Sequence, residues 1–193
     1  MTKSIFILSF VTLFAFGNLQ AQSFDLGMLD NAMGMFKSGD KNTKVAGILG
    51  DAVMSLKDEA KSSDNNFSSK LIGQASVLGG LIPSIKKGNA DMNLVQKVIS
   101  TIKTLVAAQR LKSLLGGGSL LGKSSQVNSN VGLIQSGLGA LGSGSAVDKL
   151  SSALGAVTKK SSKLEKTGIF ANLAEKAVSK KLGTSLNLLN GLL

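Results

Sequence analysis

Three pairs of adjacent lysines are the side chains of this sequence best suited to bind a ligand: Lys86–Lys87, Lys159–Lys160 and Lys180–Lys181. Ammonium groups attract phosphate, sulfate and carboxylate groups, so these pairs would suit an anionic polymer or a lipid headgroup. A second interpretation is purely structural. The first and third pairs precede Gly88 and Gly183, and cations near the C-terminus of a helix complement its dipole. Both interpretations stay open at this point.

The charge of the chain is unevenly distributed, which favours an anionic partner for its second half. Residues 22–90 hold eight lysines against seven acidic residues, so this part is nearly neutral. Residues 91–193 hold thirteen basic residues against four acidic ones, a net charge of +9. An anionic partner should therefore meet the second half. We name five candidate contacts with an anionic surface: Lys159, Lys160, Lys163, Lys180 and Lys181.

The chemistry of most enzyme active sites is missing. The chain has no histidine and no cysteine, which removes the commonest general base, thiol nucleophiles and most zinc sites. Serine–lysine catalysis needs a pair that spacing singles out, and neither Ser100 with Lys103 nor Ser179 with Lys180 stands out. We predict a protein without enzymatic activity and without a cofactor.

Two further groups of residues are weak candidates for metal or acid–base chemistry. Asp58 and Glu59 are adjacent, so on a helix they point to different sides and cannot flank one bond. Met28, Met33 and Met35 would offer soft thioether ligands for copper(I). Methionine more often fills gaps in a core, and Met28 and Met35 share a helical face with phenylalanines while Met33 leaves it. We predict no metal site.

Sequence-specific binding of nucleic acid is not expected. Arg110 is the only arginine, and the chain has no tryptophan or tyrosine. Bidentate contacts to guanine depend on arginine, and stacking on single strands depends on aromatic side chains.

The first 21 residues have the order of a secretory signal peptide. Lys3 precedes an apolar run from Ile5 to Phe16, and a short polar stretch leads to Ala21. The run is too short to span a membrane comfortably. We predict cleavage after Ala21 and a periplasmic or secreted product with no transmembrane helix; an uncleaved anchor or a buried helix is the alternative.

The segment from Asp91 to Leu115 predicts the longest helix. Asp91 suits an N-cap, and apolar residues from Leu94 to Val106 recur at helical spacing, opposite a polar arc that includes Thr101 and Thr104. After residue 108 the apolar residues change sides. Either a second partner covers that side, or the helix bends or stops near residues 109–110.

Shorter amphipathic helices are predicted on both sides of this segment, at residues 24–37, 43–61, 68–85, 145–166 and 169–182. Pro83 should kink or break the third of these, because it lacks the N–H for the helical hydrogen bond. Gly183 should separate the last helix from a short apolar tail. The buried stripe of this last helix, residues 169–182, should contain Ile169, Phe170 and Leu173, with Ala174 and Ala177. Thr167 is the candidate cap of the last helices.

Residues 116–146 are rich in glycine and uncharged from residue 124 onward. A membrane-inserting hairpin is one interpretation, but its amide side chains would be costly in lipid. A flexible loop with one short helix packed on a neighbour is the alternative.

Alternating strand patterns are nearly absent. The sequence therefore predicts residues 22–193 as a single all-α domain, an irregular bundle of about six or seven amphipathic helices with Gly/Ser-rich connections. We expect a non-catalytic binding or scaffolding protein, whose partner is an anionic component of the cell envelope or a second copy of the chain. The alternative is a membrane-active basic protein whose amphipathic helices lie on anionic lipid.

Overall fold

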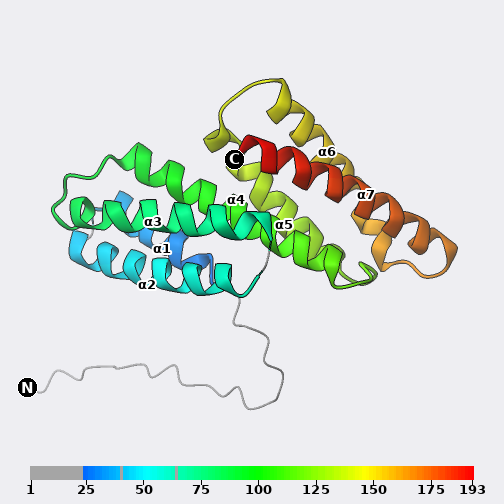
Figure 1. The fold of residues 1–193 in the computed structure, drawn as a ribbon, viewed down its shortest axis with the longest axis horizontal. Coiled ribbons are helices and arrows are strands. Elements are labelled where there is room, and N and C mark those ends of the chain that lie inside the picture. The colour runs from blue at the N-terminus through cyan, green and yellow to red at the C-terminus, as the bar shows by residue number, and fades with distance from the viewer. Residues whose placement is uncertain (1–23, 40, 64) are drawn as a thin grey trace, which may run out of the picture.

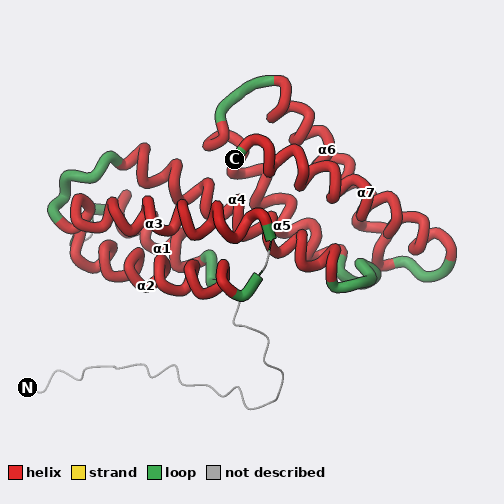
Figure 2. The backbone as a smooth tube through the Cα atoms, viewed as in Figure 1, coloured by secondary structure: helices red, strands yellow, loops and turns green. Residues whose placement is uncertain are grey.

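The structure is a computed structural model that describes residues 24–39, 41–63 and 65–193. These residues form seven α-helices and two short 3₁₀ helices and contain no strand (Figures 1 and 2). The elements in chain order are α1 (Gly27–Lys37), α2 (Asn42–Lys61), α3 (Asn66–Lys86), α4 (Met92–Gly116), α5 (Ser124–Gly137), η1 (Leu138–Leu141), α6 (Ser145–Ser161), η2 (Ser162–Glu165) and α7 (Ile169–Leu192). The predicted all-α bundle is confirmed.

Helix α4 joins two groups of helices (Figure 1). On one side α3 packs on α4, α2 packs on α3 and α1 packs on α2; on the other side α5 packs on α4, α6 packs on α5 and α7 packs on α6. Every residue of α4 from Thr104 to Gln109 is buried, so this stretch is covered on all sides. The apolar residues that change sides after residue 108 thus meet a second set of partners, and the helix continues to Gly116.

Side-chain capping explains where α3 and α4 begin. The carboxylate of Asp91 accepts hydrogen bonds from the backbone N–H groups of Asn93 at 2.8 Å and Leu94 at 3.3 Å. The Asn65 side chain accepts from Phe67 N–H at 2.9 Å. Each cap pairs backbone donors that have no partner inside the helix. The predicted N-cap at Asp91 is confirmed.

A polar cluster fixes the start of the described chain against α2 and α4. The Arg110 guanidinium donates to the Phe24 carbonyl and lies 3.3 Å from Oε1 of Glu59. The second Glu59 carboxylate oxygen accepts from Phe24 N–H. Gln109 Nε2 donates to the Glu59 carbonyl at 3.1 Å. The Glu59 side chain is only 9% exposed, so this ion pair is largely shielded from water.

Close contact between α4 and α5 depends on a glycine. A Cβ atom added to Gly137 would lie 1.9 Å from Oγ1 of Thr104 and 3.2 Å from the Ser100 carbonyl oxygen. Thr104 is fully buried there, and its hydroxyl donates to that same Ser100 carbonyl. The polar arc predicted for this helix includes Thr101 and Thr104, and both are buried; α5 covers this side of α4 at Thr104. Leu94, expected in the apolar arc, is 42% exposed.

Two predicted helix ends do not occur. Of the kink or break predicted at Pro83, the break is absent, because helix α3 continues through Pro83 to Lys86, three residues further on. Helix α7 continues through Gly183 to Leu192, so the predicted apolar tail is the second half of one long helix. The predicted cap at Thr167 is also wrong, because Gly168 occupies the N-cap position of α7 and provides no side chain.

The glycine-rich segment 116–146 contains α5 and η1, and α5 packs on α4 and α6. Its connections, such as the Gly142–Ser143–Gly144 link before α6, are rich in glycine and serine as expected. Within the described residues, no helix is both long and apolar enough to span a membrane. The predicted signal peptide, residues 1–21, lies outside the described residues, and the domain limits 22–193 stay a prediction.

Candidate functional site

Helices α6 and α7 form an antiparallel pair connected through η2 (Figure 1). Both helices bury an aliphatic line at helical spacing: Leu150, Leu154 and Val157 on α6, and Ala171, Ala174, Val178, Leu182 and Leu189 on α7. The positions of these buried residues determine which lysines of α6 and α7 face water.

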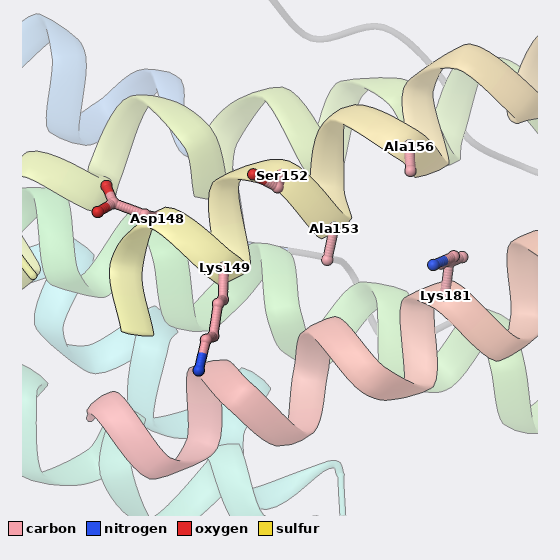
Figure 3. A pocket seen from close by; sticks show the side chains of 6 residues that line it. All are labelled: Asp148, Lys149, Ser152, Ala153, Ala156 and Lys181. Atoms are coloured by element: carbon pink, nitrogen blue, oxygen red, sulfur yellow. The ribbon is translucent and has the colours of Figure 1, made fainter. Parts of the chain in front are cut away.

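A shallow groove of about 410 Å³ lies between the two helices (Figure 3). It is lined by Asp148, Lys149, Ser152, Ala153 and Ala156 of α6 and by Lys181 of α7. Figure 3 shows the two ammonium groups well apart, with the Ser152 hydroxyl and the Asp148 carboxylate directed elsewhere. The groove therefore presents separate positive charges over a floor of small side chains, and it does not bring a nucleophile and a base together.

The structure separates the five candidate lysines into two places. Lys159 and Lys160 lie in the last turn of α6, and Lys163 follows in η2, close to the start of α7. Lys180 and Lys181 lie in the middle of α7, and Lys181 lines the groove. All five are exposed. Since α7 does not end at Gly183, the helix dipole accounts for Lys159 and Lys160 but not for Lys180 and Lys181.

Acidic residues offset little of this charge. Residues 117–193 hold nine lysines and only three acidic residues. Glu165 accepts from Ser124 N–H at 3.1 Å. Glu175 accepts from the Ser119 hydroxyl at 2.7 Å and from Leu120 N–H at 2.6 Å. Two of the three carboxylates thus hold the α4–α5 connection in place, and none of the three forms a salt bridge within the described chain.

Glu175 is held in its charged form by these contacts. The hydroxyl of Ser119 lowers the pKa of this carboxyl below its ordinary value of 4.5, and the Leu120 N–H and the positive charge of Lys123 lower it further. Hydrogen bonds to a carboxylate favour ionisation because they stabilise only the charged state well. Glu175 therefore stays ionised near neutral pH and keeps the loop attached to α7.

The first turns of α7 expose three large apolar side chains. Ile169 is 84% exposed, Phe170 is 76% exposed and Leu173 is 65% exposed. The prediction that they form a buried stripe is wrong. Ala171 and Ala174 take the buried positions, because they continue the line set by Val178 and Leu182, and the three larger residues lie off that line. Lys166 and Lys176, which sequence analysis did not select, are exposed on either side of them.

The methionines of α1 pack in or against the core. Met33, expected to leave the apolar face, is 8% exposed, while Met28 and Met35 contact the core from partly buried positions. In the part of the chain that the structure describes, no three acidic, histidine or cysteine residues gather as metal ligands.

Comparison of the chain with protein-family models, with curated proteins and with solved structures gives no match.

Proposed function

We propose that this chain is an exported, non-catalytic binding protein whose C-terminal helices hold an anionic component of the cell envelope. Periplasmic or secreted localisation is part of the proposal and is supported by the signal-like order of residues 1–21. The partner is bound by charge over an extended surface, not in a deep pocket.

The observation that carries the proposal is the excess of unpaired lysines beyond α4. Cations of α4 itself are partly used inside the fold, since Lys103 pairs with Asp30 at 2.7 Å and Arg110 pairs with Glu59. Beyond α4, nine lysines face three acidic residues, two of which are occupied by backbone N–H groups. Exposed like charges repel one another, and an anionic partner relieves that repulsion.

Binding to immobilised dextran sulfate, a polyanion without apolar groups, tests the proposal. We expect the protein without residues 1–21 to bind and to elute with salt, because counterions screen the attraction. The variant Lys149→Gln/Lys181→Gln should elute at clearly lower salt than the unchanged protein. The matched control is Lys86→Gln/Lys87→Gln, which removes the same charge at the end of α3.

If the two double variants elute at equally lowered salt concentrations, only the total charge of the protein matters. That result would overturn the assignment of the binding surface to the C-terminal helices. Failure of the unchanged protein to bind at physiological salt would overturn the proposal itself. Export is tested separately by the mass of the product recovered from the envelope fraction, which should lack residues 1–21.

A further inference from the structure

Resting on the proposed function, we infer that the anionic partner is a lipid bilayer surface, into which Ile169, Phe170 and Leu173 insert. We call these three residues the apolar tip. They lie at the start of α7, at the end of the molecule farthest from α1, α2 and α3 (Figure 1). An anionic polymer alone gives no reason for large apolar side chains at this place.

Exposure of the apolar tip is not a general property of this surface. Met54 on α2, Val77 on α3 and Leu94 on α4 are exposed singly on different helices, and Leu121, the least exposed of this group, lies in the α4–α5 connection. Scattered apolar side chains are normal on soluble proteins, whereas contiguous ones mark contact sites. Ile169 and Leu173 are one turn apart on α7, and Phe170 is adjacent, so the three side chains form one continuous patch.

Lysines surround the apolar tip. Lys159, Lys160 and Lys163 lie at the end of α6 and in η2, Lys166 precedes the tip, and Lys176 follows it one turn after Leu173. The nearest acidic residues, Glu165 and Glu175, have carboxylate oxygens occupied by the α4–α5 connection. Apolar side chains framed by lysines match an anionic bilayer, whose headgroups attract the cations while its acyl region accepts the apolar groups.

A second copy of the chain is a poorer occupant of this surface. Placing two apolar tips together would also bring their lysines together, and like charges oppose such a contact. Three side chains also offer far less than the roughly 800 Å² per partner that a standard stable interface buries. Shallow insertion in lipid needs no such buried area, because many weak electrostatic contacts between lysines and headgroups add to the binding free energy.

A single tryptophan makes a direct probe, since the chain contains neither tryptophan nor tyrosine. We would place it at the tip in Phe170→Trp and, as a matched control, on α3 in Val77→Trp, within the nearly neutral residues 22–90. With vesicles of phosphatidylglycerol and phosphatidylcholine, Phe170→Trp should shift its emission to the blue and be quenched by lipids brominated on the acyl chain. Val77→Trp should do neither, and pure phosphatidylcholine should have little effect on both.

The variant Ile169→Ser/Phe170→Ser/Leu173→Ser measures the contribution of the apolar tip. It should bind anionic vesicles at least about tenfold more weakly while binding dextran sulfate as the unchanged protein does. Circular dichroism checks that it keeps its helices, which we expect because all three residues are exposed. The variant Lys166→Gln/Lys176→Gln should weaken vesicle binding and make the remaining binding less sensitive to salt.

The outcomes separate this inference from the function on which it rests. If tryptophan at position 170 stays exposed on vesicles and the triple variant binds them normally, insertion is overturned while binding of dextran sulfate still supports the proposed function. A blue shift that follows protein concentration without vesicles would assign the tip to self-association and overturn the lipid assignment. Loss of both vesicle and dextran sulfate binding in the unchanged protein overturns both proposals.

Discussion

The two ends of this molecule use charge and apolar surface in opposite ways. The first end consists of α1, α2 and the face of α4 that lies against them. There, acidic and basic side chains form ion pairs between helices, as in Lys103 with Asp30 and Arg110 with Glu59. In the second, built from α5, α6 and α7, lysines remain without acidic partners and three large apolar side chains lie at the surface. The first arrangement stabilises a fold, whereas the second leaves interactions for a partner.

Both ends have the same simple helical architecture, so the contrast does not come from the fold. In each end, the helix next to α4 in the sequence packs on α4, and the remaining helices pack on one another in sequence order (Figure 2). The difference lies in which residues occupy the outer faces. If this comparison is right, substitutions of polar groups in the first end should reduce stability, and those of lysines in the second should reduce binding.

The largest loss of stability is expected from Arg110→Ala. It would leave the largely buried Glu59 carboxylate without its cation and the Phe24 carbonyl without a donor, at a cost of about 3 kcal/mol. Urea unfolding followed by far-ultraviolet circular dichroism measures this loss. Lys61→Ala is the matched control, because Lys61 pairs with Asp58 at 3.9 Å with both side chains exposed, and surface pairs contribute little. Similar small effects in both variants would contradict the proposed importance of the buried pair.

A smaller loss is expected where the two ends join, from Gly137→Ala. The added methyl group would collide with the buried Thr104 side chain and push α5 from α4, at about 2 kcal/mol. The control is Gly132→Ala in the same helix, where a Cβ meets nothing within 4 Å and the better helix propensity of alanine adds up to about 1 kcal/mol. The unfolding midpoints should thus move in opposite directions. Thr104→Ala should partly restore the stability of Gly137→Ala, and an unchanged loss in the double variant would argue against the collision.

Local signals in the sequence are sufficient to predict that most of the helices exist, but not where each one ends. The spacing of Val95, Val98 and Ile102 and the capping carboxylate of Asp91 define α4 without any tertiary information. Contacts between distant segments were not visible in the same way. No local pattern indicates that Gly137 leaves room for the Thr104 side chain, or that Arg110 binds Glu59 and Phe24. These residues are separated by 33 to 86 positions in the sequence, and only the packing of α4 brings them together.

The candidate site shows how one wrong helix boundary changes the interpretation of a surface. Ending the last helix at Gly183 made Ile169, Phe170 and Leu173 its natural apolar stripe. A helix that continues to Leu192 instead has its buried line through Val178, Leu182 and Leu189, and that line leads back to Ala171 and Ala174. The same boundary made Lys180 and Lys181 look like a helix C-terminus. One glycine in an exposed helix costs only about 1 kcal/mol, which tertiary packing readily outweighs.

The smallest effect that tests the comparison concerns Glu175, an acidic residue of the second end that serves the fold. Its pKa is lowered by the Ser119 hydroxyl, by Leu120 N–H and by Lys123. Because the folded pKa lies below the ordinary value, the contribution of Glu175 to stability is fully present above about pH 5.5 and decreases as pH falls through the folded pKa.

The difference in urea midpoint between the unchanged protein and Glu175→Gln should therefore be constant near neutral pH and shrink in acid. Asp51→Asn, at an exposed position in the middle of α2, is the control and should show no such trend. A difference that is independent of pH would mean that Glu175 holds the α4–α5 connection by shape alone, without a contribution from its charge.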